Sequence, residues 1–209
     1  MKTPGPLLAV FAVLLLDGPA VRAGEPATNN PSRFCCCRTE APDPFTDKSL
    51  YQTESKWTTD SRKQIRLGGL AGRPQVVVMF FASCRYACPL IVNDMRRIET
   101  ALPPEQRNRV GFTLVSFDSR RDTPAALAEY RRLRDLPADR WTLLHGETDD
   151  VMELAALLGV RYKEDAQGQF MHSNVITILN AEGEIVHQQI GLNQDIQETV
   201  RVLEKLAGR

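Results

Sequence analysis

The sequence predicts an α/β protein with parallel core strands, helices on both faces of the sheet and an antiparallel hairpin near the C-terminus. Apolar, β-branched runs alternate along the chain with segments whose apolar residues recur at helical spacing, which is typical of a sheet with crossover helices. The last two strand-like runs are joined instead by the short turn sequence NAEG, which favours a hairpin.

The first half of this order contains two buried strands and the helix between them. Residues 49–67 carry strand-like pieces around Trp57. Residues 76–81 form a continuous apolar run that suits a strand buried on both faces. Residues 110–117 are predicted to form a second buried strand. The helix between them has Pro89 in its first turn and ends at Pro103. Its apolar stripe consists of Ile91, Met95, Ile98 and Leu102.

The second half contains three more helices, a short strand and the hairpin. One helix begins at Asp122-Thr123-Pro124 and stops before Pro137, and a strand follows at residues 141–144. Thr148 is predicted to cap the next helix. Residues 175–179 and 184–189 form the hairpin, and the final helix follows it. A thioredoxin-like fold has this order of elements.

Composition limits the classes of function that need be considered. The chain has 209 residues, of which 43% are hydrophobic and 25% are charged, as in a globular soluble protein. Because 26 basic residues balance 26 acidic ones, the net charge gives no general attraction to nucleic acid or to anionic lipid.

The N-terminal segment, residues 1–23, is predicted to be a signal peptide. Lys2 precedes a short apolar block at residues 7–16, and Ala23 ends a suitable cleavage sequence. The block is shorter than the ~20 apolar residues of a spanning helix, so we expect no stable membrane span. Export to the periplasm would place the cysteines where thiols tend to oxidise.

Residues 24–44 are rich in Pro, Asn, Thr and charge, which predicts a flexible arm before a single domain at residues 45–209. The arm contains Cys35, Cys36 and Cys37. They are either incidental thiols that oxidise or bridge other molecules, or a tether that collects a soft metal ion or reduces another disulfide.

Two thiols stand where the first buried strand gives way to its helix, in the sequence FFASCRYACP. Cys84 and Cys88 suit a structural disulfide, a redox-active pair or a chelate for a soft metal. The start of a helix lowers the pKa of a thiol, and Arg85 is expected to act in the same direction. A disulfide closing so short a loop would be an unusual structural staple.

An imidazole is expected to reach the same edge of the sheet. Cys84 and Asp118 each follow a strand of the predicted parallel core, and ligands gather at the carboxyl ends of such strands. If the first hairpin strand is antiparallel to the central one, His172 comes to this edge as well. Two thiolates with one imidazole favour copper among the first-row metals, whereas zinc usually takes a fourth ligand.

The segments SCRYACP, VSFDSRRDTPAALAEY and HSNVITILNAEGEI resemble, in order and in separation, the three signature segments of the Sco/SenC copper-chaperone family. The resemblance covers the chain from about residue 50 to the C-terminus. The chain departs from the common family pattern at Tyr86, Ser119 and Met171.

This resemblance implies a thioredoxin-like domain that binds Cu(I) or Cu(II) through two cysteines and a histidine. It also implies delivery of copper to cytochrome c oxidase, or adjustment of the thiols at the copper centre of that enzyme. By motif match the implied metal ligands are Cys84, Cys88 and His172, and Asp118 has a supporting or partner-docking role. The implied partners are the copper-bearing subunit of the oxidase or another exported cuproprotein, and a thiol reductant.

The leading hypothesis is therefore a copper-transfer protein rather than a turnover enzyme. A second hypothesis is a thiol–disulfide oxidoreductase in which Cys84 attacks and Cys88 resolves, with a Cys84–Cys88 disulfide as its oxidised form. A third, a peroxiredoxin-like peroxidase, would need a lone low-pKa cysteine in a Thr/Pro-rich loop, and the FFASCRYACP segment fits that poorly.

Overall fold

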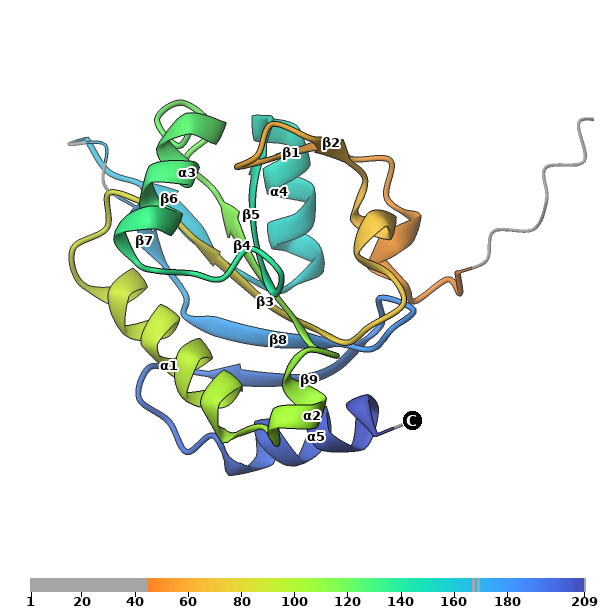
Figure 1. Ribbon diagram of the computed structural model, residues 1–209. Coiled ribbons are helices and arrows are strands. Elements are labelled where there is room, and N and C mark those ends of the chain that lie inside the picture. The colour runs from red at the N-terminus through yellow and green to blue at the C-terminus, as the bar shows by residue number, and fades with distance from the viewer. Residues whose placement is uncertain (1–44, 167, 169, 209) are drawn as a thin grey trace, which may run out of the picture. The chain divides into compact units, whose positions relative to one another are not determined.

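A seven-stranded sheet organises the part of the chain that the computed structural model describes, which is residues 45–166, 168 and 170–208 (Figure 1). The strand order is β2-β1-β5-β4-β3-β8-β9. The strands are β1 Trp57–Thr59, β2 Gln64–Ile65, β3 Gln75–Phe80, β4 Gly111–Ser116, β5 Trp141–Gly146, β8 Val175–Leu179 and β9 Ile185–Ile190. Two further strands, β6 Tyr162–Glu164 and β7 Phe170–His172, pair only with each other.

The centre of the sheet is parallel and its flanks are antiparallel. Strands β3, β4 and β5 run parallel to one another, and β8 runs antiparallel to β3. Every residue of β3 and of β4 is buried, which explains the continuous apolar run at residues 76–80 of β3. In β4 the buried residues include the polar Thr113 and Ser116. The predicted parallel core with an antiparallel C-terminal hairpin is thus confirmed.

Helices cover both faces of the sheet. The helices are α1 Ala87–Ala101, α2 Pro104–Arg107, α3 Pro124–Leu133, α4 Thr148–Leu157 and α5 Gln197–Ala207, with 3-10 turns η1 Leu50–Gln52 and η2 Leu67–Leu70. In Figure 1, α1 and α5 lie together on one side of the sheet, and α4 lies on the other. Thr148, the predicted cap of α4, is instead its first residue, and Glu147 is the N-cap.

The β8–β9 hairpin turns where the sequence NAEG predicts. Gly183 has a φ of +88°, a conformation that suits glycine because it lacks a Cβ. The Asn180 side chain accepts hydrogen bonds from the backbone N–H groups of Glu182 (3.2 Å) and Glu184 (2.8 Å). These bonds hold the turn that joins β8 to β9.

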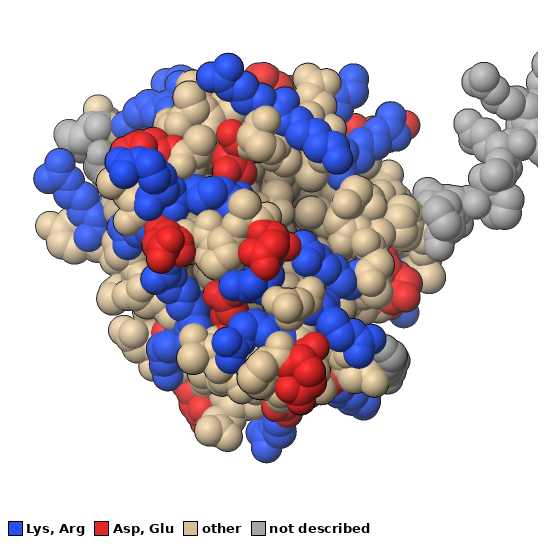
Figure 2. All heavy atoms as spheres, in the orientation of Figure 1, with Lys and Arg blue, Asp and Glu red and all other residues tan. Residues whose placement is uncertain are grey.

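The distribution of surface charge agrees with the equal numbers of acidic and basic residues in the sequence. Acidic and basic side chains are interspersed over the face shown in Figure 2, so no large field of one sign stands out on it. Within residues 45–208, apart from the two positions not described there, no helix has the length and apolar character needed to cross a bilayer.

Candidate metal centre

Cys84 and Cys88 flank the start of α1, just beyond the carboxyl end of β3. Cys84 is half-buried in the connecting loop, and Cys88 is fully buried in the first turn of the helix. The backbone N–H of Cys88 donates a hydrogen bond to the Cys84 sulfur, with N and Sγ 3.4 Å apart. The Cys84 sulfur therefore takes up one of the N–H groups that a helix N-terminus leaves unpaired.

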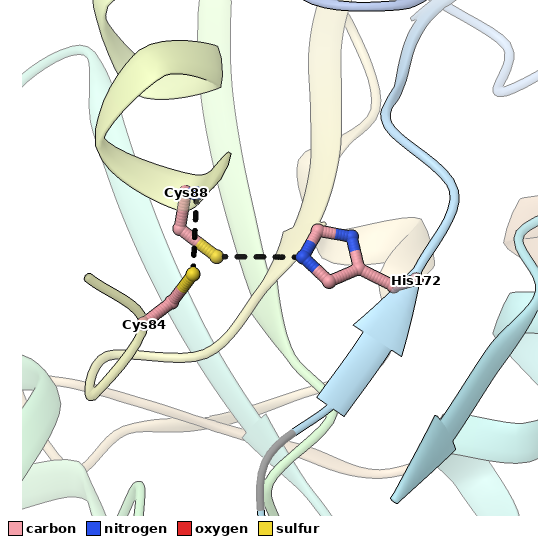
Figure 3. A group of neighbouring side chains, drawn as sticks. All are labelled: Cys84, Cys88 and His172. Carbon is pink, nitrogen blue, oxygen red and sulfur yellow. Dashed lines mark hydrogen bonds between the residues drawn. The ribbon is translucent and has the colours of Figure 1, made fainter. Parts of the chain in front are cut away.

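His172 ends β7 and points its ring toward the two sulfurs (Figure 3). Its Nε2 lies 3.7 Å from the Cys88 Sγ. The two sulfurs and the ring nitrogen all lie within 4.8 Å of one another. A trigonal metal with bonds of about 2.0–2.3 Å holds its donor atoms about 4 Å apart, so the three side chains fit one metal ion with small adjustments.

The imidazole is held in the form that binds a metal. Its Nδ1 lies 3.1 Å from the Ser173 carbonyl oxygen, and because a carbonyl only accepts, Nδ1 carries the proton and Nε2 keeps a free lone pair. Burial lowers the pKa of His172 below its ordinary value, although the bond to Ser173 opposes this. The ring is therefore neutral near pH 7.

Burial reverses the sequence-based expectation for one of the thiols. The start of a helix was expected to lower a thiol pKa, but desolvation raises the pKa of Cys88 far above its ordinary value, and the neighbouring Cys84 adds to the rise. The helix terminus does not compensate for the loss of water. In the metal-free protein Cys88 is thus a protonated thiol whose S–H can donate to His172 Nε2.

Aromatic packing fixes the β6–β7 hairpin that carries His172. The His172 ring lies 5.0 Å from the ring of Phe117 and 6.1 Å from that of Phe81, centroid to centroid. Tyr162 stacks on Phe117 at 5.2 Å, and Phe170 packs against both phenylalanines. Phe81 and Phe117 follow directly on β3 and β4, so the main sheet supports the hairpin through its own aromatic side chains.

Asp118 does not join the group of ligands but reaches the hairpin through Arg121. The Asp118 carboxylate is 1% exposed and accepts hydrogen bonds from the Arg121 side chain and backbone. Arg121 also donates to the Gly168 carbonyl at the hairpin turn, and its guanidinium lies 5.8 Å from the centre of the Phe170 ring. This geometry favours the supporting role that was expected of Asp118 over direct contact with a partner.

Asp122 anchors the loop that leads to Cys84. Its Oδ2 accepts hydrogen bonds from the Ala82 backbone N–H at 2.8 Å and from the Ser116 hydroxyl at 2.5 Å. It thereby ties the segment after β3 to the end of β4. Desolvation raises the pKa of Asp122 above its ordinary value, and the two hydrogen bonds only partly offset this.

The sequence interpretation missed Arg121, Asp122 and the separate hairpin. Tyr162 and Phe170 flank the turn-like sequence KEDAQGQ, which is a signal for a hairpin that was overlooked. His145 and His187 do not belong to the ligand group among the described residues. The predicted signal peptide and the arm with Cys35, Cys36 and Cys37 lie outside the described residues.

Comparison with known families shows which family the chain belongs to. The SCO1/SenC family model matches residues 46–208, which is most of the chain. The chain belongs to the SCO1/SenC family. The structures of Sco proteins that it resembles are thioredoxin-like, as the order of elements predicted.

A curated relative agrees with membership of the SCO1/SenC family. A protein of Stutzerimonas stutzeri that is named a copper-binding protein is 28% identical over 120 residues, which cover 56% of this chain and 57% of that protein. The chain thus spans little more than half the length of this curated relative.

Two solved Sco structures share the fold at low identity. Arabidopsis thaliana ScoI with copper bound has a TM-score of 0.62 and 19% identity, and the match covers 72% of this chain and 94% of that one. BsSco, described as a Sco-family protein with a disulfide switch, has a TM-score of 0.63 and 19% identity, over 73% and 91% of the two chains.

Replacing Arg121 with Gln is expected to loosen the β6–β7 hairpin, because Gly168 and Phe170 lose their contact with the guanidinium. The measurement is amide hydrogen exchange of the metal-free domain, in which protection of the β6 and β7 amides should fall while that of β3 and β4 is retained. Arg132→Gln is the matched control, since Arg132 pairs with Glu129 on the surface of α3. Unchanged exchange in the hairpin would show that the aromatic cluster alone holds it.

Two substitutions of Asp122 distinguish the effect of its charge on stability from the effect of its hydrogen bonds. Asp122→Ala should reduce the free energy of unfolding by roughly 1–3 kcal/mol for each buried donor left unpaired. Asp122→Asn keeps an acceptor and removes the buried charge. Because the folded-state pKa of Asp122 lies above its ordinary value of 3.8, the wild type loses stability as the pH rises from 3.8 through that folded-state pKa.

The Asn variant should therefore gain stability relative to the wild type across the same pH window. Urea unfolding of both proteins from about pH 3 to about pH 7 tests this sign. A stability difference that is independent of pH would contradict the raised pKa.

Proposed function

We propose that this protein binds copper through Cys84, Cys88 and His172 and transfers it to a copper protein. The observation that carries the proposal is the convergence of these three side chains, with ligand atoms within 4.8 Å of one another, from segments 84 residues apart. Two sulfurs and one neutral imidazole form a soft donor set of low coordination number, which favours copper.

The ligand set fits copper better than zinc. Among the residues that the structure describes, the ligand group contains no fourth His, Cys, Asp or Glu, whereas structural zinc sites are almost always four-coordinate. Binding would ionise both thiols, so the protons of Cys84 and Cys88 would leave as the metal enters. The copper-bound Sco structures and the copper-binding relative support this assignment.

We further propose that the protein is exported to the periplasm and contributes to assembly of the copper centre of cytochrome c oxidase. The family of BsSco is described as cytochrome c oxidase assembly proteins. The basic and apolar N-terminal sequence supports export. The copper-receiving protein would be the copper-bearing oxidase subunit or another exported cuproprotein, and a thiol reductant would keep the cysteines reduced.

A second candidate function, thiol–disulfide oxidoreductase, is favoured by the unequal exposure of the two thiols. Cys84 is partly exposed and Cys88 is fully buried. Cys84 is therefore placed to attack an external disulfide and form a mixed disulfide, which Cys88 then resolves. The substrate disulfide gains two electrons and two protons, and the protein is left with the Cys84–Cys88 bridge.

Each of the three ligands should be required for tight binding of one copper per domain. We expect Cys84→Ser, Cys88→Ser and His172→Ala each to weaken copper binding by more than the roughly 10–100-fold typical of changes that only reorient a metal ligand. The measurement is titration with Cu(I) and with Cu(II), separately, against a competing chelator.

Two precautions make this test decisive. All variants also carry serine at residues 35, 36 and 37, so that the arm cannot mask a loss at the site. His187→Ala is the control, because His187 contacts Thr199 and lies outside the ligand group. Full copper retention in His172→Ala would remove the metal-site assignment and favour the oxidoreductase.

Oxidation of the site should block copper binding. Peroxide converts the two thiols into a Cys84–Cys88 disulfide, and each molecule of hydrogen peroxide becomes two molecules of water. Because a sulfur in that bridge no longer offers a thiolate, loading with copper should require a reductant. Mass spectrometry counts the bridge and titration counts the copper. Copper binding that survives complete bridging would rule out the cysteines as ligands.

A further inference from the structure

A pocket of about 460 Å3 opens directly onto the candidate metal centre. The ligands Cys84 and His172 form part of its wall, whereas Cys88 is buried behind them. The other lining residues are Phe81, Arg85, Tyr86, Ala87, Phe170 and Met171. A donor atom arriving from outside would therefore approach the site through this pocket and meet Cys84 first.

Large apolar side chains stand exposed around the pocket. Tyr86 is 84% exposed and Met171 is 66% exposed, and both line its mouth. Leu90, 39% exposed, lies one helical turn from Tyr86 along α1. Clusters of exposed apolar residues mark interaction surfaces when they border a site. Tyr86 and Met171 border the position where a metal would enter or leave, and Leu90 adds exposed apolar surface farther along α1.

The charge at the pocket has one sign. Arg85 is the charged residue among the described residues that line it. Its side chain is exposed, and it takes part in none of the ion pairs found in the described part of the chain. An occupant with a carboxylate near Arg85 would be attracted electrostatically, whereas a basic one would be repelled.

We propose that Arg85, Tyr86, Leu90 and Met171 form the docking surface for a copper-exchanging protein, which places an acidic, apolar loop with soft ligands in this pocket. The inference rests on the proposed function and adds the chemistry of the partner. A small thiol would fill the pocket but leave Tyr86 and Met171 largely in water. Only a macromolecular surface buries both of these side chains while it reaches Cys84.

Exchange on this surface needs no change of oxidation state. Bonds from Cu(I) to two thiolates of the partner form as its bonds to Cys84, Cys88 and His172 break. The two thiol protons that the partner releases are taken up by the cysteines of this protein. Docking raises the local concentration of the incoming thiolates, and this accelerates a transfer that would otherwise depend on chance encounters.

Two synthetic peptides test the proposal with defined probes. Both contain two cysteines flanked by leucines, and they differ only in carrying aspartates or lysines beside them. Cu(I)-loaded full-length protein is mixed with each peptide by stopped flow, and the rate of copper transfer is measured. We expect the acidic peptide to accept copper about five-fold faster or more at low salt, with the difference shrinking as salt is added.

Variants assign this rate difference to the docking surface. Arg85→Glu should reverse the preference between the two peptides, and the comparison within one variant cancels any effect on copper affinity. Tyr86→Ser and Met171→Gln should slow transfer to the acidic peptide by about three-fold or more, because each variant loses apolar contact with the leucines of the peptide. The controls are Arg66→Glu, Leu133→Ser and Met152→Gln, which change exposed residues away from the pocket lining and should leave the rates unchanged.

The outcomes separate failure of this inference from failure of the proposed function. If the wild type binds no copper, the proposed function fails and the docking surface with it. If copper binds normally but both peptides accept it equally fast, or Tyr86→Ser and Met171→Gln match the controls, only the docking surface is overturned. Transfer to free glutathione as fast as to the acidic peptide would overturn it in favour of a small-thiol pocket. Self-association that Tyr86→Ser abolishes would overturn it in favour of a second copy of this chain.

Discussion

The antiparallel pairing of β8 with β3 is the constraint on which the rest of the site depends. The pairs Val76↔Ile178 and Val78↔Ile176 set the two strands in register, and both strands are fully buried. Because the strands run in opposite directions, the residues before β8 meet the residues after β3. A shift by one residue would turn the buried side chains of β8 toward the other face, so the packing of the core fixes where the segment carrying His172 joins β8.

The ligands are held with unequal rigidity. Cys84 lies in the short loop between β3 and α1, and Cys88 lies in the first turn of α1. His172 instead belongs to a two-stranded hairpin outside the main sheet. A hairpin of that size is marginally stable by itself. It depends on the rings of Phe81 and Phe117 and on the chain of contacts from Asp118 through Arg121 to Gly168. The histidine is therefore the ligand whose position can respond most readily to a partner or to oxidation.

Burial also divides the chemistry between the two sulfurs. Cys88 is desolvated, and its thiol is hard to ionise without a metal, while Cys84 borders the pocket. A metal cation can supply the charge that stabilises the Cys88 thiolate, and the neutral His172 requires no further deprotonation. Such a site favours soft cations over free thiolate chemistry. Under the proposed functions, copper transfer and disulfide exchange would share one entrance, the Cys84 side, and would compete for the same two sulfurs.

The sequence by itself determined the architecture and the candidate ligand group, because local sequence patterns encode both. The continuous apolar run in β3 follows from burial on both faces, and the NAEG turn follows from the conformational freedom of Gly183. The C-x-x-x-C spacing and His172 identified the candidate ligands once parallel and antiparallel strands were assigned.

Only the tertiary structure decided the roles of the supporting residues. The sequence could not show that Arg121 spans from Asp118 to Gly168, or that Asp122 holds the Ala82 backbone, because these contacts join segments whose separation in the chain carries no periodic signal. It also could not give the pKa of Cys88. A helix terminus can be recognised locally, but desolvation depends on everything packed around the sulfur, and here desolvation is the larger effect.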